Sequence, residues 1–431
     1  MRRQALLFPL IILLAFVDAY ASRQSDSGST QNASVELFQR QNVTGEWFNG
    51  RPFLEVRGVE FFGEFTCDVW GNTQGGLRTG SVYTGLLTFG ADVDLEKLVG
   101  WDGGSLGTTW LWLSGRDASE DLVGNFLTVS NISGFNTLRM MELWFQQDFF
   151  EDKVSFRLGN ITADSEFLVS DYGGLFINAE FGWPALTSMN MASGGAAFPV
   201  GGLGARLAYQ PTDSLGFRSG VFLIDLIPQN INRAGFRWDL NAKQAVTWMN
   251  EVCFSHGGGE GSRGLPGFVK AGMWLQTGAE ANALDPASGV PNSGFYLLAD
   301  QRLLAEHHGK ETVNDEGLGG FAGIGFAPPN RNAVDFYLNL GLTYKGLVPN
   351  RDDDAFGVSF GLASLSRGAD DSLREEGLSP QAAEMVLEVT YQCVLAPWCF
   401  VQPDLQYIIN PGAAGNSGNA LVLGVRFSAV F

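Results

Sequence analysis

The chain has 431 residues and carries 46 acidic against 27 basic side chains, a formal net charge of −19 at pH 7. So large an acidic excess argues against nucleic-acid binding, which needs a basic surface. Glycine (56 residues) and phenylalanine (33) are abundant while histidine (3) is scarce, which suits tight turns, close strand packing and the aromatic girdles of a membrane barrel.

The N-terminus has the three parts of a secretory signal peptide. Met1-Arg2-Arg3 is a basic start, Ala5 to Val17 is almost wholly apolar, and Ala19-Tyr20-Ala21 is a small-x-small cleavage site. We predict a signal peptide over residues 1–21. No later stretch approaches the ~20 consecutive apolar residues of a membrane-spanning helix. An exported chain that belongs in a membrane is therefore expected to cross it as strands.

From residue 56 to the end, segments with a two-residue hydrophobic period recur between turn residues. The clearest is 333–345, where apolar residues occupy one row and Asp335, Asn339 and Thr343 lie in the other. Most segments have the ~9–11 residues of a tilted membrane strand. We predict an all-β fold, a transmembrane antiparallel up-and-down barrel of about sixteen strands over 56–431, preceded by a periplasmic segment over 22–55. The predicted strands are 56–70, 81–95, 104–114, 137–149, 153–162, 202–211, 216–225, 244–256, 266–277, 293–303, 317–327, 333–345, 354–365, 382–394, 398–409 and 419–431.

The connections between these segments support the same architecture. With both ends of the barrel domain in the periplasm, connections after odd-numbered strands face outside, and these are mostly long. Several inside turns are short, as in outer-membrane barrels, although those near 257–265, 304–316 and 346–353 are longer. The longest connection, 163–201, is expected to fold inward and narrow the pore, because so long a connection in a compact barrel is usually functional.

The last segment, 419–431, has one row that is apolar throughout and another that includes Arg426. In water an exposed apolar row on a terminal strand is an aggregation hazard, whereas it is expected if the row faces lipid and the strand closes a barrel. An edge strand of a soluble sandwich is the alternative. The expected partners are outer-membrane lipid and, through this strand, the barrel-assembly machinery; whether barrels associate as a homo-oligomer is left open.

The four cysteines are compatible with an exported compartment, where disulfides can form. Cys393 and Cys399 flank a hairpin turn and share one strand phase, so a disulfide between them is one reading and two free thiols the other. Cys67 and Cys253 are interpreted as small residues of the barrel wall.

Several stretches, in order along the chain, resemble the carbohydrate-selective porins of the OprB type. They are 95–104 (LEKLVGWDGG), 142–147 (ELWFQQ), 157–167 (RLGNITADSEF), 181–184 (FGWP), 204–211 (GARLAYQP), 344–352 (YKGLVPNRD) and 403–411 (PDLQYIINP). The resemblance implies a sixteen-stranded outer-membrane barrel that admits sugars. Its function would be diffusion of mono- or small oligosaccharides through a constricted, water-filled lumen, without a cofactor.

Strand phase assigns charged and amide side chains to the lumen. A pore that prefers sugars needs hydrogen-bond donors and acceptors and flat apolar faces at a narrow point. The preferred constriction set combines residues beside or within 163–201 with two others: Arg157, Arg206, Asp164, Glu166, Trp183, Glu142 and Arg78. The predicted lumen residues are Glu60, Glu64, Asp68, Asp92, Asp94, Glu142, Gln146, Arg157, Arg206, Lys270, Arg302, Glu384, Glu388, Gln402, Asp404, Gln406 and Arg426.

Other functions remain as alternatives from the residues alone. A barrel enzyme would need Ser and His or paired acids in the wall, and His256 and His307-His308 fall at a strand end and in a turn. No catalytic or metal site is predicted. The main rival is a general or cation-preferring porin, because an acidic lumen concentrates cations; the family resemblance favours sugars.

Overall fold

The computed structural model describes residues 40–238, 240, 244–258, 264–306 and 316–431. The predicted signal peptide, 1–21, and His307-His308 lie outside these residues. No helix among the described residues is long and apolar enough to cross a membrane.

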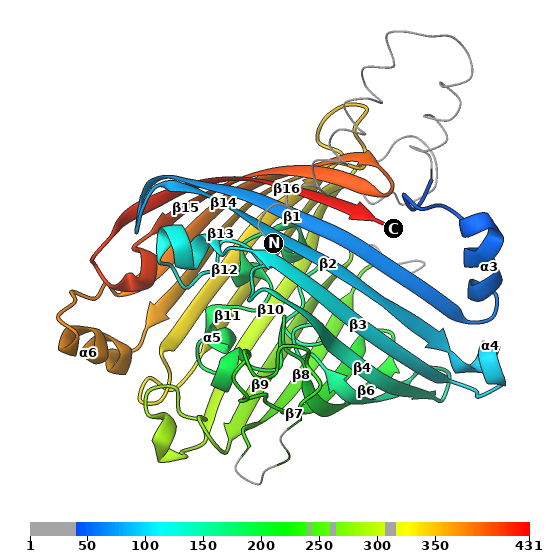
Figure 1. Ribbon diagram of the computed structural model, residues 1–431, viewed down its shortest axis with the longest axis horizontal. Helices are drawn as coiled ribbons and strands as arrows, with labels where there is room; N and C mark the ends of the chain where they lie inside the picture. The colour runs from blue at the N-terminus through cyan, green and yellow to red at the C-terminus, as the bar shows by residue number, and fades with distance from the viewer. Residues whose placement is uncertain (1–39, 239, 241–243, 259–263, 307–315) are drawn as a thin grey trace.

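Within the described ranges, sixteen strands form one closed barrel in which each strand runs antiparallel to both neighbours (Figure 1). The predicted fold is confirmed, with most strand boundaries within two residues of those expected. The strands are β1 (Val59–Gly76), β2 (Gly80–Asp94), β3 (Gly104–Gly115), β4 (Thr137–Phe149), β5 (Val154–Ile161), β6 (Gly202–Thr212), β7 (Leu215–Leu223), β8 (Val246–His256), β9 (Gly267–Thr277), β10 (Asn292–Ala305), β11 (Gly317–Phe326), β12 (Val334–Lys345), β13 (Ala355–Leu365), β14 (Ala383–Ala396), β15 (Cys399–Ile409) and β16 (Gly418–Val430).

The seam between β16 and β1 closes the barrel. Asp68 on β1 lies opposite Arg426 on β16, and the two side chains form paired contacts, Nε to Oδ1 at 2.7 Å and Nη2 to Oδ2 at 2.9 Å. Beside them the hydroxyls of Thr66 and Ser428 are 3.1 Å apart. Full closure leaves no strand edge.

The two faces of the strands differ as the alternation predicts. On β16, Leu423 and Val425 are exposed on the outer surface, whereas Arg426 is buried on the lumen side. The expectation that the apolar row of the last strand points away from the lumen is confirmed. An outward apolar band around a polar interior is the arrangement that a bilayer requires.

The barrel has a short-turn end and a long-connection end. At the short-turn end lie α3 (Gly50–Glu55) and α4 (Leu95–Val99), and at the opposite end α6 (Arg367–Glu375) projects after β13 (Figure 1). Two of these helices start at side-chain caps: Asp94 accepts from the backbone N–H of Lys97, and Ser366 from that of Ala369. The turn after β6 comprises only residues 213–214, as expected for this end.

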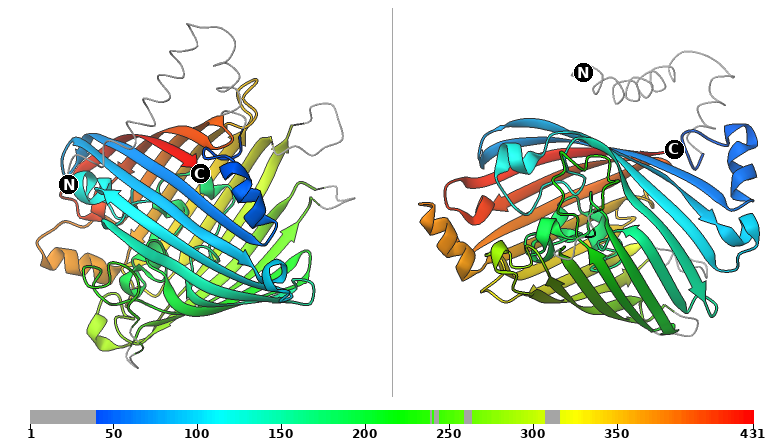
Figure 2. Two further views of the ribbon diagram at one scale, coloured as in Figure 1. Left: turned by 45° about the vertical axis from the view of Figure 1, so that its right-hand side comes forward. Right: turned by 60° about the horizontal axis from the view of Figure 1, so that its bottom comes forward.

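Two connections from the long-connection end fold into the barrel, as the right-hand panel of Figure 2 shows. One, here the long inward connection, is 162–201 and holds η4 (Gly173–Leu175), η5 (Ala179–Phe181), α5 (Ala185–Ser188) and η6 (Ala192–Gly194). The other, the second inward connection, is 116–136 and begins with the π-helical turn η3 (Ser119–Val123). The first was predicted to fold inward; the second was not. Both bury apolar side chains against lumen-side residues in one cluster.

Glycines of the wall make room for the long inward connection. A Cβ on Gly319 of β11 would lie 2.0 Å from the ring of Tyr172, and one on Gly357 of β13 would lie 2.8 Å from Phe176. Both rings come from the long inward connection. The glycines of these strands therefore serve close packing of a loop against the wall.

Of the two readings for Cys393 and Cys399, the structure has the free thiols. The regular register of β14 with β15 places Cys393 opposite Val401, and after a shift beyond Val394 Cys399 lies opposite Ala396, so the two cysteines are not cross-strand partners. The Sγ of Cys393 instead lies 3.0 Å from Nη2 of Arg351.

Candidate functional site

The inward connections are fixed to one side of the barrel by carboxylates of the wall. Glu384 on β14 accepts hydrogen bonds from the backbone N–H groups of Phe126 and Leu127, at 3.1 and 2.7 Å. Glu388, four residues further along β14, accepts from those of Ile177 and Asn178 at 2.6 and 3.1 Å. Both carboxylates are fully buried, so this part of the lumen is filled by protein.

Other lumen-side residues extend these attachments to neighbouring strands. Asp300 on β10 accepts from the backbone N–H groups of Asp171 and Tyr172 at 2.7 and 3.0 Å. Amide and ammonium groups of the wall donate to loop carbonyls, at 2.6–2.9 Å, from Lys270, Gln402 and Gln406. Strand phase placed Lys270, Gln402 and Gln406 on the lumen side correctly and missed Asp300. These side chains hold loops and do not line open space.

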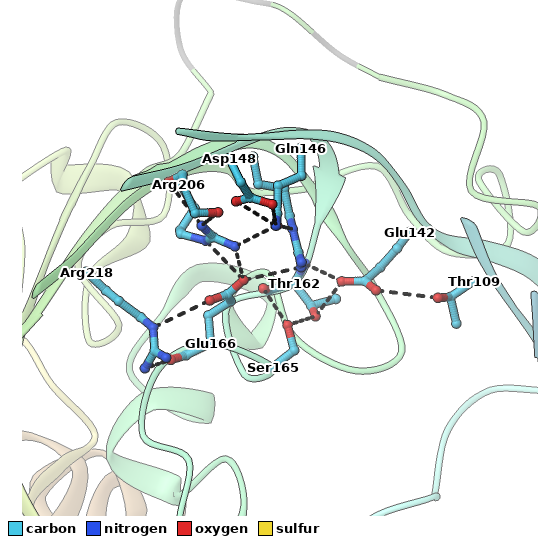
Figure 3. A network of polar contacts seen from close by, with 11 residues as sticks. Thr109, Glu142, Gln146, Asp148, Thr162, Ser165, Glu166, Arg206 and Arg218 are labelled. Carbon is cyan, nitrogen blue, oxygen red and sulfur yellow. Dashed lines mark hydrogen bonds and ion pairs between the residues drawn. The ribbon is translucent and has the colours of Figure 1, made fainter. Parts of the chain in front are cut away.

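The opposite wall, formed by β4 to β7, carries polar side chains that are partly exposed. The long inward connection contacts this wall through Glu166. Glu166 of that connection lies among three arginines on successive strands (Figure 3). Its Oε1 is 2.9 Å from Nη2 of Arg206 and 3.2 Å from Nη1 of Arg157, and its Oε2 is 3.6 Å from Nε of Arg218. One loop carboxylate thus faces β5, β6 and β7 at once.

Side chains of β4 and β5 orient these arginines. Gln146 accepts from Nε of Arg157 at 2.9 Å and from Nη2 of Arg206 at 3.1 Å. Arg206 also donates to the hydroxyl of Ser155 at 2.8 Å. The guanidinium of Arg157 lies over the ring of Trp144, 4.2 Å from its centroid, a cation–π geometry.

Glu142 extends the same network toward β3. Its Oε1 accepts from the backbone N–H and the hydroxyl of Thr162, at 3.0 and 2.9 Å, and its Oε2 from Thr109 at 3.5 Å. The root of the long inward connection is therefore attached to β4 (Figure 3). The structure brings together four members of the predicted constriction set: Glu142, Arg157, Glu166 and Arg206.

The remaining three predicted members lie elsewhere. Trp183 donates its indole N–H to the carbonyl of Gly194 at 2.9 Å, and Asp164 accepts from the backbone N–H of Phe198 at 2.8 Å; both border a separate cavity. Burial raises the pKa of Asp164 to about 6. Arg78 is exposed and donates to the carbonyl of Asp121 at 2.8 Å, so it supports the second inward connection and is not part of the arginine cluster.

Sequence reasoning missed Arg218 and Glu251. They are direct cross-strand partners on β7 and β8, with Nη1 of Arg218 3.6 Å from Oε1 of Glu251. Glu251 also accepts from Tyr296 and from the backbone N–H of Leu168, at 2.8 and 3.0 Å. Strand phase would have found both residues, because each is a charge in the lumen-side row of its strand.

Chemically, this network offers guanidinium donors, carboxylate and amide acceptors and one indole face. Among the described residues no group of three His, Cys, Asp or Glu side chains is arranged to hold a metal ion. We call Glu142, Gln146, Arg157, Glu166, Arg206 and Arg218 the charged narrowing, because four of them belong to the constriction set expected from the sequence. Such a set can exchange hydrogen bonds with a hydroxylated solute.

One family model and several known proteins match this chain. The sequence model of the carbohydrate-selective porin, OprB family, matches residues 78–431. Porin B of Pseudomonas aeruginosa is 25% identical over 435 residues, covering 90% of this chain and 91% of that protein. The high-pH structure of Pseudomonas putida OprB has a TM-score of 0.80 at 24% identity, covering 91% of this chain and 99% of its own. The low-pH structure of the same protein has a TM-score of 0.59 at 21% identity, with the same coverage.

Proposed function

This chain belongs to the carbohydrate-selective porin (OprB) family, and we propose from that premise that the charged narrowing is where it selects its solutes. It is an outer-membrane porin for carbohydrates, with a sixteen-stranded barrel as the pore wall. The observation that carries the proposal is the position of Glu166, a loop carboxylate between arginines of β5, β6 and β7.

A sugar that passes this point sheds part of its water. The network replaces that water with fixed donors and acceptors, while the indole of Trp144 beside Arg157 presents an apolar surface. Because each arginine is already hydrogen-bonded to Glu166 or Gln146, the donors are held in place before the solute arrives. Binding stays weak enough for the solute to leave, as conduction requires.

The three arginines differ in their access to a solute. The side chain of Arg218 is 39% exposed, that of Arg157 20% and that of Arg206 5%. Arg218 and Arg157 are therefore proposed to contact the sugar. Arg206 is proposed to position Glu166, since it donates to that carboxylate through both Nε and Nη2.

Sugar block of ion current through single channels tests the proposal. Wild-type current should fall with added glucose or maltose in a saturable manner. Loss of a charged hydrogen-bond donor at a half-exposed site costs ~1.5 kcal/mol, so Arg218→Ala and Arg157→Ala should each weaken the block roughly tenfold. The matched control is Arg351→Ala, an arginine whose partners lie at the short-turn end, and it should bind sugar as the wild type does.

A general or cation-preferring porin is the second candidate, favoured by the net charge of −19. A negative lumen concentrates cations without binding sugars. In that case added sugar would lower the wild-type current no more than its viscosity does, and the arginine variants would change only conductance. That result would replace the sugar-selective proposal.

The orientation of the barrel is also proposed, from the alternation of long and short connections. Epitope tags placed in 226–243 or 366–381, at the long-connection end, should be reached by antibodies on intact cells. A tag at 213–214 should be reached only after the outer membrane is broken. Labelling in the opposite sense would reverse the assignment of the two ends.

A further inference from the structure

The connection that follows β7 reaches back past β6, β5 and β4 to the outer face of β3. Its first part, 224–238, is here called the outer connection. The ring of Phe236 lies 5.5 Å from that of Trp110 on β3. Trp110 belongs to the outward row of β3, because Leu111 and Leu113 in the other row are buried against residues of the inward connections. Phe236 therefore lies on the lipid-facing side of the barrel.

Hydrogen bonds fix the outer connection to β4 and β5. The carbonyl of Arg233 accepts from the hydroxyl of Thr137 at 2.6 Å, and Nη2 of Arg233 donates to the carbonyl of Asn136 at 3.0 Å. The indole N–H of Trp238 donates to Oδ1 of Asn160 at 3.2 Å. The outer connection is thus bound to the wall at several points and presents a defined surface, which lowers the entropy cost of binding a ligand.

This surface combines aromatic rings with arginines. Phe236 and Trp238 are half-exposed, and Arg233 and Arg237 are exposed beside them. Within the described ranges, the hydrogen bonds of Arg237 are made by its backbone N–H and carbonyl, both to the side chain of Asn232 at 3.0 Å. The guanidinium of Arg237 is therefore open to a ligand.

The outer connection is locally positive in a chain whose net charge is −19. The one acid among its residues is Asp225, whose two carboxylate oxygens accept from the backbone N–H of Ile227 at 2.9 Å and from Asn232 at 2.8 Å. Arg233 and Arg237 lie four residues apart on the exposed side. An anionic group is attracted to these arginines although the chain as a whole repels it.

Exposed arginines beside aromatic rings, at the border of a lipid-facing surface, match a lipid with a phosphorylated headgroup. Arginine pairs with phosphate through two parallel hydrogen bonds, and aromatic side chains are enriched where a membrane meets water. In the orientation proposed above, this end of the barrel lies in the outer leaflet, which consists largely of phosphorylated glycolipid. The charge of that lipid and the continuity with the outward row of β3 both identify it as the occupant.

We propose that the outer connection is a docking surface for a phosphorylated glycolipid of the outer leaflet. A phosphate of the lipid binds Arg233 and Arg237, and its acyl chains lie along Phe236 and the outward row of β3. The inference rests on the proposed orientation of the barrel and is independent of solute selection at the charged narrowing. A bound lipid would cover the outer connection and hold it against the wall.

The test measures binding of lipid A to the purified full chain in detergent, by native mass spectrometry. Arg237→Ala should weaken binding of lipid A with two phosphates about fivefold, the equivalent of ~1 kcal/mol for one basic residue at an anionic surface. Removal of one phosphate from the lipid should weaken binding to the wild type by a similar factor and binding to Arg237→Ala by less. Arg237→Lys should keep most of the affinity, because it keeps the charge.

The matched control is Arg367→Ala, an exposed arginine at the start of α6, on another side of the long-connection end. It should bind lipid A as the wild type does. Phe236→Ser should weaken binding of lipid A with either number of phosphates, because it removes an apolar contact. Heat-modifiable mobility and sugar-free conductance report whether each variant is folded.

Phosphatidylglycerol and inorganic phosphate identify the source of the phosphate. Tighter binding of lipid A than of phosphatidylglycerol, together with the loss in Arg237→Ala, would support the proposal. Equal affinity for the two lipids, or displacement of lipid A by millimolar inorganic phosphate, would overturn the assignment to a glycolipid. Equal affinity of the wild type and Arg237→Ala would overturn the site itself. Lipid-free dimers that Phe236→Ser abolishes would assign the surface to a second copy of the chain and would also overturn the proposal.

Discussion

The two sides of the lumen use the same residue type for different purposes. On the side of β10 and β14, the carboxylates of Asp300, Glu384 and Glu388 are buried and accept backbone N–H groups of the inward connections. On the side of β4 to β7, the carboxylate of Glu166 belongs to a connection, is partly exposed and faces arginines of the wall. One side fixes the loops, and the other leaves charged groups in contact with water.

The comparison teaches that lumen-side polarity has two roles that strand phase cannot separate. A buried carboxylate is retained only if hydrogen bonds compensate its lost hydration, and the loop backbone supplies them. A partly exposed arginine–carboxylate cluster keeps donors that can exchange partners with a solute. Burial and the nature of the partner, and not the amino-acid type, decide which role a residue has.

The largest effect is expected from removing an attachment on the side of β10 and β14, where the carboxylates hold the inward connections. Glu384→Ala would leave the N–H groups of Phe126, Leu127 and Gly412 without their acceptor. At ~1–3 kcal/mol for each buried group, the cost is about 3 kcal/mol or more. The second inward connection should loosen, so single-channel conductance should rise and proteases should cleave within 116–136. Glu384→Gln, which keeps one acceptor oxygen, is the matched control. Equal conductance and protection in wild type and alanine variant would contradict the attachment role.

A smaller effect is expected from a substitution on the side of β4 to β7, where Glu166 faces the arginines. Glu166→Gln keeps the shape of the side chain but leaves Arg157, Arg206 and Arg218 without their shared carboxylate. One unit charge at about 4 Å in water is worth ~1 kcal/mol, so permeability for anions relative to cations should rise about fivefold. Reversal potentials in a salt gradient measure this ratio. Glu96→Gln, an exposed acid on α4, should not change it; an unchanged ratio in Glu166→Gln would place the narrowest point elsewhere.

The smallest effect is expected in the pH dependence of ion selectivity, through Asp164, which is two residues from Glu166. Its pKa is raised to about 6 by burial, so the carboxyl is ionised at pH 7.5 and neutral at pH 5. Acidification should therefore reduce cation preference, and Asp164→Asn should remove part of this pH dependence. Because the folded pKa exceeds the unfolded value of ~3.9, the contribution of Asp164 to stability is largest at low pH and declines as pH rises through about 4 to 6. Identical pH profiles of reversal potential in wild type and variant would contradict this assignment.

Much of the fold could be predicted because barrel strands carry local signals. The two-residue period and the turn residues between strands located all sixteen strands, and even the inward fold of the long connection followed from its length. The inward fold of 116–136 could not be predicted, because it depends on Glu384 and Asp68, which are far away in sequence. Residue spacing also left open whether Cys393 and Cys399 pair, because pairing depends on the register of the hairpin, which places Cys393 opposite Val401.

Within the site, sequence reasoning found the residues near the long inward connection and missed their partners across strands. Arg157, Glu166 and Arg206 were identified because they lie in or beside that connection. Arg218 was overlooked although its phase was readable, since no sequence feature linked β7 to Glu166. Trp183 and Asp164 were assigned to the same cluster as Glu166, but the turn of the chain after Thr162 directs them to a separate cavity.

The seam pair of Asp68 and Arg426 also determines the order in which the molecule can be completed. These residues are 358 positions apart, and the second inward connection uses both, through Ser130 and Asn131. The surface that this connection contacts is therefore formed by the first strand and the last. Before the last strand is added, the pair of Asp68 and Arg426 that binds this connection is not formed. Residues 116–136 can therefore reach their final position only after β16 has paired with β1. Maturation of the pore interior is thus a late event in folding, coupled to ring closure across almost the whole chain.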